Sequence, residues 1–384
     1  MHRTTALVTT VIVVAGHHLG AQSRLSKPVI DTVNHHIVRV TNSGPSAWAD
    51  TNGWKLVLER TVQPADGAPG MLEDPDDIIL MNDGRLIIGQ RHPASVRLYD
   101  REGTFVRTIG RAGDGPGEYR APNIAVFHDT LVTYDGAIGR ASLFTVDGKF
   151  VRTFLTNVHD DGPPIAIDSR GRLRIEQDRA GGGFKKDWIF FNLTGKRLDS
   201  VAVPQATHVL TWDVQIPGGS MSRGVPNTPR NIVATFGDGS FAVGGSDHYA
   251  FTHVGPHGDT TRIFARSSIT AERISSAHRD SLFAPIARVQ ALRGVATARD
   301  IPSELPVMTD AVTDPLGNLW VMTGPTRNGR LDVYNPAGNY LGAVASPLKM
   351  FALTSWTADH VAVYNTDAND LPRIQIYRID RRGK

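Results

Sequence analysis

One pattern of short strands and glycine turns recurs six times along this chain of 384 residues. Its first copy, at residues 76–110, is DDIILMNDGRLIIGQRHPASVRLYDREGTFVRTIG. This copy contains four apolar, β-branched runs, and tight turns at Asp83-Gly84 and Glu102-Gly103 each join two of them. Two-residue turns with glycine between such runs are strong hairpin signals. The unit is therefore predicted to be a four-stranded antiparallel meander.

The later copies repeat the same order of strands and turns, and they start near residues 124, 164, 231, 310 and 352. The sixth copy supplies only three strands, whereas WKLVLERTV at residues 54–62 precedes the first copy without a partner. If this early strand completes the last unit, the units close into a ring without exposed sheet edges. We therefore predict an all-β fold over residues 51–384: a six-bladed β-propeller with four-stranded antiparallel blades, closed by the N-terminal strand. The alternative is a pair of β-sandwiches, which would not repeat one turn pattern six times.

Two long connections interrupt the repeat. Residues 204–229 join the third and fourth blades and are predicted to include an extra strand pair. Residues 267–305 join the fourth and fifth blades and are predicted to be a small helical insertion. Within it, apolar residues recur at near-helical spacing, with Asp280 or Ser281 as the expected cap, Pro285 in the first turn, Gly294 at the end and a weaker helix over 271–279. Both insertions should emerge on one face of the disc, where they either pack on the blades beneath them or wall a pocket at the central channel.

The N-terminus has the pattern of a secretory signal. Arg3 is followed by an apolar stretch, Ala6 to Gly16, and then by the small residues Gly20 and Ala21. We predict a signal peptide at residues 1–21, a linker at 22–50, and a secreted or periplasmic protein without a membrane span after cleavage. The alternative is that the stretch stays uncleaved as an anchor.

Composition excludes several function classes. The chain has no cysteine, so disulfides, thiol nucleophiles and thiolate metal sites are excluded. The formal net charge is +3 with both signs interspersed, which argues against a nucleic-acid-binding surface. We expect a monomer.

The stretch GRAGDGPGEY at residues 110–119 resembles a loop that could hold a phosphate or a metal. A phosphate loop must open a helix, whose amide groups hold the anion. Here Pro122 is followed by the strand IAVF instead, and the Lys-Ser/Thr pair of a P-loop is absent. We therefore predict a structural turn between the first two blades, with ligand contact as an additional role.

The same region carries a family resemblance. IGRAGDGPGEYRAPNIAVF, followed by RASLFTVDGKFVRTF, resembles the NHL-type repeat and related secreted bacterial six-bladed propellers. In those families a strand ends in Gly-Arg-x-Gly, and Gly-Glu-Phe/Tyr and a proline precede the innermost strand of the next blade. The resemblance covers residues 54–384 and is sharpest at 96–154. The third and fourth junctions lack the glycine-rich turn, so the resemblance implies the fold and not a particular ligand.

Candidate functional residues come from topology, because the common catalytic motifs are missing. Loops after each second strand and between blades share one face around the channel, and the polar residues there are Arg91, His92, Asp135, His159 with Asp160 and Asp161, Asp178, Asp247, His248 and Asp367. Carboxylates and histidines that converge could hold a divalent cation such as calcium, as in propeller lactonases and amidating lyases. No cofactor and no catalytic residue is assigned.

We expect a binding or interaction module that takes a protein, glycan or small-molecule ligand on this face. The alternative is a metal-assisted, lactonase-like hydrolase or lyase at the central channel. A third alternative, nucleic-acid binding, is disfavoured by the signal pattern and the small net charge.

Overall fold

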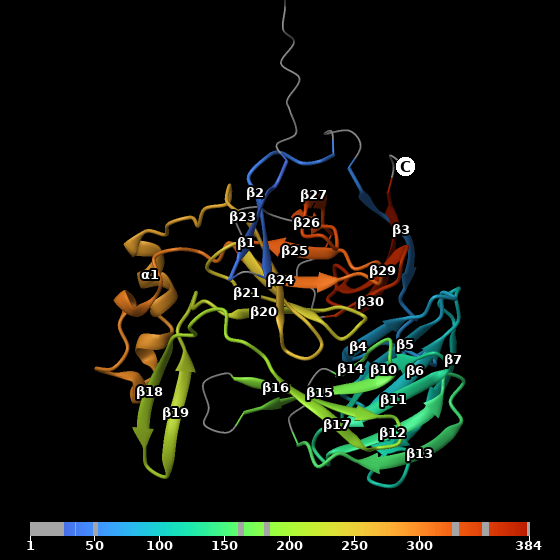
Figure 1. Ribbon diagram of the computed structural model, residues 1–384. Helices are drawn as coiled ribbons and strands as arrows, with labels where there is room; N and C mark the ends of the chain where they lie inside the picture. The colour runs from blue at the N-terminus through green and yellow to red at the C-terminus, as the bar shows by residue number, and fades with distance from the viewer. Residues whose placement is uncertain are drawn as a thin grey trace, which may run out of the picture.

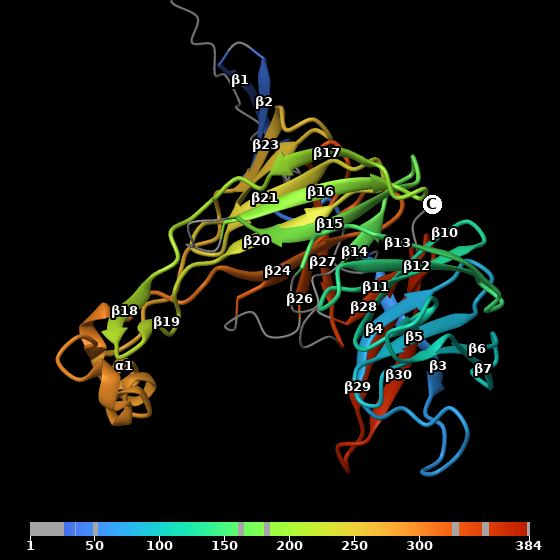
Figure 2. The ribbon, with the colours of Figure 1, turned by 90° about the horizontal axis from the view of Figure 1, so that it is seen from below.

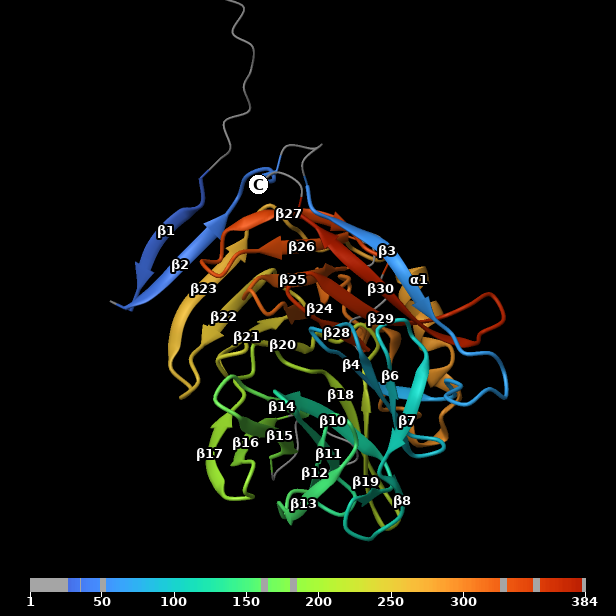
Figure 3. The same cartoon turned by 90° about the vertical axis from the view of Figure 1, so that its right-hand side faces the viewer.

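The computed structural model describes residues 27–34, 36–48, 53–159, 165–179, 185–324, 330–347 and 353–381. These residues form a six-bladed β-propeller of four-stranded antiparallel sheets with a single α-helix, which confirms the predicted fold (Figures 1 and 3). The first three blades are β4 (Pro75–Leu80), β5 (Leu86–Gln90), β6 (Ser95–Tyr99) and β7 (Phe105–Ile109); β10 (Pro122–Phe127), β11 (Thr130–Asp135), β12 (Arg140–Thr145) and β13 (Phe150–Leu155); and β14 (Ile165–Ile167), β15 (Arg172–Asp178), β16 (Lys186–Asn192) and β17 (Arg197–Ala202).

The remaining blades follow the same order along the chain. They are β20 (Asn231–Thr235), β21 (Phe241–Gly245), β22 (Ala250–Val254) and β23 (Thr260–Arg266); β24 (Met308–Thr313), β25 (Leu319–Thr323), β26 (Arg330–Tyr334) and β27 (Tyr340–Ala345); and β28 (Thr354–Trp356), β29 (His360–Thr366), β30 (Pro372–Asp380) and β3 (Lys55–Val62). The N-terminal strand β3 pairs antiparallel with β30, so it completes the sixth blade as predicted.

The ring has six small cores rather than one. Each cluster of buried apolar side chains lies between two neighbouring blades, as with Leu131 and Phe144 of the second blade against Ile87 and Leu98 of the first. The second strands of blades 1, 4 and 5 are buried at all five positions because a sheet covers them on both faces. This explains why these strands are continuous apolar runs in the sequence.

The segment expected to be a linker, residues 22–50, instead contains two strands among its described residues. β1 (Val29–Val33) and β2 (Ile37–Asn42) form a hairpin, and β2 pairs in parallel with β23 at the outer edge of blade 4. Ile37, Val40 and Asn42 are buried there. Asn42 donates to the carbonyls of Ala265 (3.2 Å) and Gly338 (3.0 Å) and accepts from the amide of Tyr340 (2.9 Å). The strand was missed because its pairing depends on a sheet edge more than 200 residues away. The expected signal peptide lies outside the described residues.

The first insertion contains the predicted strand pair, β18 (Thr211–Ile216) and β19 (Gly219–Gly224). The second is helical, as predicted, but its bounds differ. α1 spans Ser276–Phe283 with Ser275 as its cap, and Pro285 follows the helix instead of opening it. Short 3₁₀ turns then cover η1 (Ile286–Arg288), η2 (Gln290–Leu292) and η3 (Ala298–Asp300). Pro285 has no N–H to donate, so it separates the two helical stretches that the apolar spacing had joined.

The two insertions pack against each other and form one body, called the appendage here (residues 204–229 and 267–305). Its small core contains Trp212, Val225, Ile286, Leu292 and Ile301. The Trp212 indole stands edge-on to Phe283 and donates a hydrogen bond to Asp300 (2.9 Å). Figure 2 shows β18, β19 and α1 together, projecting to one side of the disc. No helix in the described ranges is long and apolar enough to cross a membrane.

Candidate functional site

One face of the propeller carries most of its irregular chain. Because the strands of a blade alternate in direction, the loop after each second strand and the connection to the next blade lie at the same end. That end, called the loop-bearing face here, holds GRAGDGPGEY and both roots of the appendage. The sequence candidates were chosen for this face.

The loop GRAGDGPGEY is closed by its own charges. Arg111 pairs with Glu118 (2.5 Å), and Arg120 pairs with Asp114 (2.6 Å). Glu118 also accepts a hydrogen bond from the amide of Gly115 (2.6 Å). Gly110 has φ +70°, and a Cβ there would lie 2.7 Å from the Tyr119 ring, so only glycine fits. The loop therefore has the structure of a turn whose polar groups bond to each other.

Arg91 and His92 each bond to an acid of blade 1. One of these acids lies within the innermost strand, β4, and the other just before it. Arg91 donates to Asp76 (2.8 Å), and His92 Nδ1 lies 2.9 Å from Asp74. The His92 side chain is 79% exposed. The first two candidates thus lie near each other, but in separate pairs.

Asp135 and His159 have different surroundings. Asp135 is 2% exposed and accepts hydrogen bonds from the amides of Arg120 (2.6 Å) and Ala137 (3.1 Å). It therefore caps backbone groups at the junction of blades 1 and 2. His159 is exposed, and its neighbours Asp160 and Asp161 lie outside the described residues.

Asp178 and Asp367 are also engaged. Asp178 bonds to Lys186 (2.5 Å). Burial alone would lower the pKa of Lys186, but hydrogen bonding and the charges of Asp178 and Glu176 raise it above its ordinary value. Asp367 accepts from Gln63 (2.7 Å) and from the amides of its own turn, and these bonds lower the pKa of its carboxyl. Both aspartates stabilise the loops that carry them.

Asp247 and His248 form the remaining pair, in the loop after the second strand of blade 4. Asp247 lies 2.9 Å from His248 Nδ1 and accepts from the Thr207 hydroxyl (2.9 Å), which belongs to the appendage. Across the described ranges, no three histidine, aspartate and glutamate side chains are placed to hold one metal ion. Of the described candidates, the structure thus bonds only Asp247 and His248 to each other.

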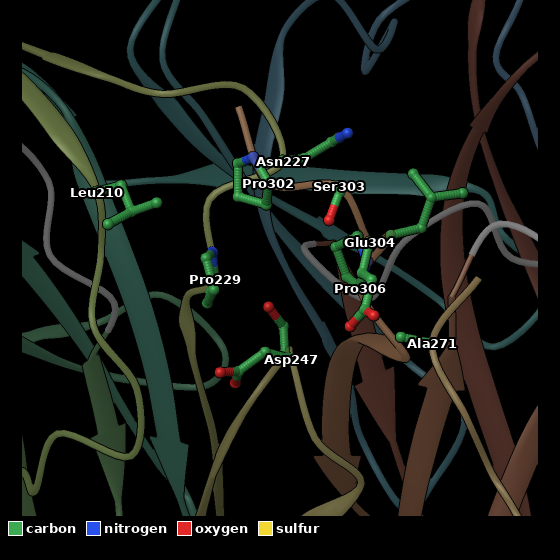
Figure 4. A pocket seen from close by; sticks show the side chains of 11 residues that line it. Leu210, Asn227, Pro229, Asp247, Ala271, Pro302, Ser303, Glu304 and Pro306 are labelled. Carbon is green, nitrogen blue, oxygen red and sulfur yellow. The ribbon is translucent and has the colours of Figure 1, made fainter. Parts of the chain in front are cut away.

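A pocket of about 310 Å³ lies where the appendage meets blades 4 and 5 (Figure 4). Its walls come from both insertions and from the loop of Asp247, and they comprise Leu210, Asn227, Pro229, Ser246, Asp247, Ala271, Pro302, Ser303, Glu304, Leu305 and Pro306. Figure 4 shows Pro302 and Ser303 on one side of the space and Asp247 on the other. The volume lies in the lower range of ligand pockets. We call it the root pocket.

The root pocket combines apolar walls with a few polar groups. Three prolines and two leucines supply rigid apolar surface, and Asp247 and Glu304 supply carboxylates. The Asn227 Nδ2 group is buried without a hydrogen-bond partner among the described residues. A buried unpaired donor costs free energy unless an acceptor reaches it.

Close backbone approach fixes one wall of the root pocket. The amide of Gly324 donates to the carbonyl of Val307 (2.9 Å). A Cβ on Gly324 would lie 1.9 Å from the carbonyl oxygen of Pro306. Glycine at 324 therefore lets the chain that returns from the appendage lie close against the end of β25 as it enters β24.

Of the candidates that lie in the described ranges, only Asp247 lines the root pocket. The sequence did contain a signal for the other residues that line the root pocket. PNTP at 226–229 and IPSELP at 301–306 lie at the ends of the two insertions. Paired prolines at both roots indicate rigid, fixed connections rather than free loops. Their convergence depends on the tertiary fold.

No protein-family model and no curated protein matches this chain. Solved structures do match. A protein of Bacteroides fragilis NCTC 9343, whose name describes it as exported, is 12% identical, with a TM-score of 0.52, and the match covers 89% of this chain and 99% of that one. A catalytically inactive virginiamycin B lyase from Staphylococcus aureus, solved with quinupristin, is 9% identical over 85% of this chain and 99% of that one, with a TM-score of 0.43. At these identities the first match shows the fold alone.

Proposed function

We propose that this protein is an exported, NHL-like β-propeller that binds a ligand through its loop-bearing face, in the root pocket. The observation that carries the proposal is the construction of this pocket. Two insertions, far apart in the sequence, fold on each other and enclose it against blades 4 and 5. Long insertions with their own core are often functional, and a rigid ring beneath them holds the pocket in shape.

The lining indicates the chemistry of the ligand. The Asn227 amide group needs an acceptor oxygen, while the Asp247 and Glu304 carboxylates and the Ser246 and Ser303 hydroxyls accept hydrogen bonds. Proline and leucine walls favour an apolar body between these polar ends. Part of a peptide or of a glycan has this mixture of groups, as do many small molecules.

Export is supported by the N-terminal pattern and by the name of the Bacteroides fragilis protein that shares the fold. The NHL-like assignment is supported by the junction between blades 1 and 2, where the glycine-rich turn leads directly into β10. We propose that the mature protein begins after Ala21 and acts as a monomer.

One observation favours a second candidate, a metal-assisted hydrolase or lyase at the central channel. Asp77 lies on the innermost strand of blade 1, and burial raises the pKa of its carboxyl to about 7. Carboxyls with such a pKa can exchange protons near neutrality. Its oxygens, however, accept from the amides of Ile78 and Ile124 (both 2.9 Å), which is the geometry of a link between blades.

Pocket binding is tested by a ligand screen that includes a variant in which a tryptophan side chain fills the root pocket. Mature protein, the Ser303→Trp variant and the control Ser222→Trp are screened against glycan and peptide arrays, and binding ligands are titrated by calorimetry. Ser303 lines the root pocket, whereas Ser222 is exposed on β19. We expect ligands that bind wild type and Ser222→Trp but lose affinity at least tenfold for Ser303→Trp. Equal affinity for all three proteins would contradict the proposal.

Elemental analysis separates the two candidates. A stoichiometric divalent ion, whose removal by EDTA lowers the melting temperature and abolishes hydrolysis of lactones or esters, would support the channel enzyme. A metal-free protein that is indifferent to EDTA would contradict that candidate and leave pocket binding as the proposal to pursue.

A further inference from the structure

We propose that the tip of the appendage, residues 276–299, is a docking surface for an acidic polysaccharide. This surface is separate from the root pocket. The segment contains four arginines (Arg279, Arg288, Arg293 and Arg299), no lysine and a single acid, Asp280, which gives it a formal charge of +3. The whole chain has the same formal charge, so the tip concentrates the excess.

Three of the four arginines of the tip are available to a partner, whereas Arg279 is half-buried. Arg288, Arg293 and Arg299 are exposed, and none of their guanidinium groups has an ion pair or hydrogen bond among the residues that the structure describes. On the ring, by contrast, many arginines meet an acid, as Arg85 meets Asp83 (2.8 Å) and Arg378 meets Glu59 (2.7 Å). The tip therefore keeps an uncompensated positive charge.

The acids of the appendage stabilise its fold and do not neutralise the tip. Asp300 accepts from the Trp212 indole (2.9 Å) and from the amide of Thr297 (2.7 Å), and Asp213 accepts from the Thr211 hydroxyl (3.1 Å). Glu304 pairs with Arg273 near the root. This division leaves carboxylates for internal hydrogen bonds and guanidinium groups for an external anion.

Two features favour a polysaccharide over other polyanions. The tip has no tryptophan or tyrosine, and its phenylalanine packs in the appendage core, so no aromatic surface is offered to stack bases. Among the described residues of the tip, Val295 is the large apolar side chain exposed to solvent, at 45%. One exposed valine is too little apolar surface for insertion into a lipid bilayer. Arginine binds the carboxylate and sulfate groups of such a polymer in a bidentate manner, as it also binds phosphate, so its geometry suits the ligand without selecting it.

The body that carries these arginines is small and projects from the disc (Figure 2). Contacts of α1 with η1 and η3 hold the four arginines on one compact unit. Charges carried on one small unit act together on a flexible polyanion, and the binding should weaken as salt screens them. If the protein is exported, as proposed above, acidic polysaccharides are polymers that it meets outside the cell.

Affinity chromatography on heparin and titration with polygalacturonate test the proposal. The variant Arg288→Gln/Arg293→Gln/Arg299→Gln is compared with Arg170→Gln/Arg197→Gln/Arg330→Gln, which removes the same charge from exposed arginines of the ring. We expect the ring variant to elute with wild type and the tip variant to elute at clearly lower salt. The slope of log affinity against log salt should fall by roughly one for each tip arginine that binds. Melting curves establish that both variants fold.

Several results would overturn the proposal. One is elution of the tip variant together with wild type, and another is an equal shift in both variants, which would show general charge attraction only. A third is tighter binding to vesicles containing phosphatidylglycerol, or to duplex DNA, than to either polysaccharide. Root-pocket binding is measured separately with Ser303→Trp, which should elute from heparin with wild type, so failure of one proposal does not imply failure of the other.

Discussion

The ring and the appendage bury their side chains in different ways. In the ring, each second strand packs between two sheets, and six cores lie between neighbouring blades. In the appendage, a few residues from two distant insertions share one small core, and no residue of α1 is buried. The repeated blades of the ring therefore form the rigid support, while the irregular chain of the appendage forms most of the root pocket and the charged tip. If the two parts are this distinct, substitutions in one should leave the stability of the other nearly unchanged.

The largest expected effect comes from tryptophan removal. Trp320 is fully buried between blades 5 and 6, so Trp320→Ala should lower the free energy of unfolding by about 3–5 kcal/mol. Trp212→Ala should instead loosen the appendage and leave the main transition of the ring nearly unchanged. Urea unfolding and limited proteolysis measure the two effects. If Trp212→Ala shifted the main transition as far as Trp320→Ala, the appendage would be part of the ring's cooperative unit.

The next effect concerns the residue at which the chain leaves blade 4 for the appendage. Arg266 pairs with the buried Asp332 (2.5 Å) and stacks on Tyr340. Arg266→Ala should cost about 3–5 kcal/mol, because it leaves a buried carboxylate without its cation. The exposed pair of Arg101 and Glu102 is the control, and Arg101→Ala should leave the free energy of unfolding nearly unchanged, because solvent screens this pair. Chemical denaturation compares them; equal costs would contradict the view that this buried pair fastens β23 of blade 4 to β26 of blade 5.

A pH-dependent effect should belong to the ring alone. Burial raises the pKa of Asp77 from 3.8 to about 7, so the folded ring favours the protonated carboxyl. The stabilisation from this group is complete below about pH 4 and is lost as pH rises to about 7, a change of roughly 2–4 kcal/mol. Asp77→Asn should flatten the pH dependence of unfolding over this range. Protection from hydrogen exchange should fall with rising pH in blades 1 and 2 and not in the appendage. If Asp77→Asn left the pH dependence of unfolding unchanged, Asp77 would not be the group responsible.

The smallest predicted effect tests the N-terminal hairpin. Asn42→Ala removes three hydrogen bonds that fasten β2 to blades 4 and 5, and it should cost about 1–3 kcal/mol. Faster hydrogen exchange should be confined to β1, β2 and the outer strands of these blades. Thr41→Ala, one residue earlier on the same strand, is the control. Faster exchange throughout the appendage would show that the hairpin supports both parts.

The sequence allowed the ring to be predicted because its signals are local and repeated. Asp-Gly, Glu-Gly and Pro-Leu-Gly turns separate runs whose alternation or continuity follows from burial within each blade. The position of β3 followed from counting strands. β2 could not be found in this way, because Asn42 meets its partners only in the folded ring.

The candidate site was predicted less well than the fold. The root pocket lies on the face that the topology indicated, but aspartates such as Asp135 and Asp367 accept from backbone amides of their own loops, which is the common use of aspartate in turns. The root pocket contains residues from positions 210 to 306, and prolines and an asparagine define it more than acids do. No spacing rule predicts such a set, because only the packing of two insertions brings it together.

A crystal structure of the mature protein with a ligand from the arrays would show directly whether the root pocket binds that ligand. We expect ligand density in the root pocket, with an acceptor atom within hydrogen-bond distance of Asn227 Nδ2 and apolar contact with Pro229, Pro302 or Pro306. Ligand density in the central channel beside a bound divalent ion, with an empty root pocket, would contradict this expectation.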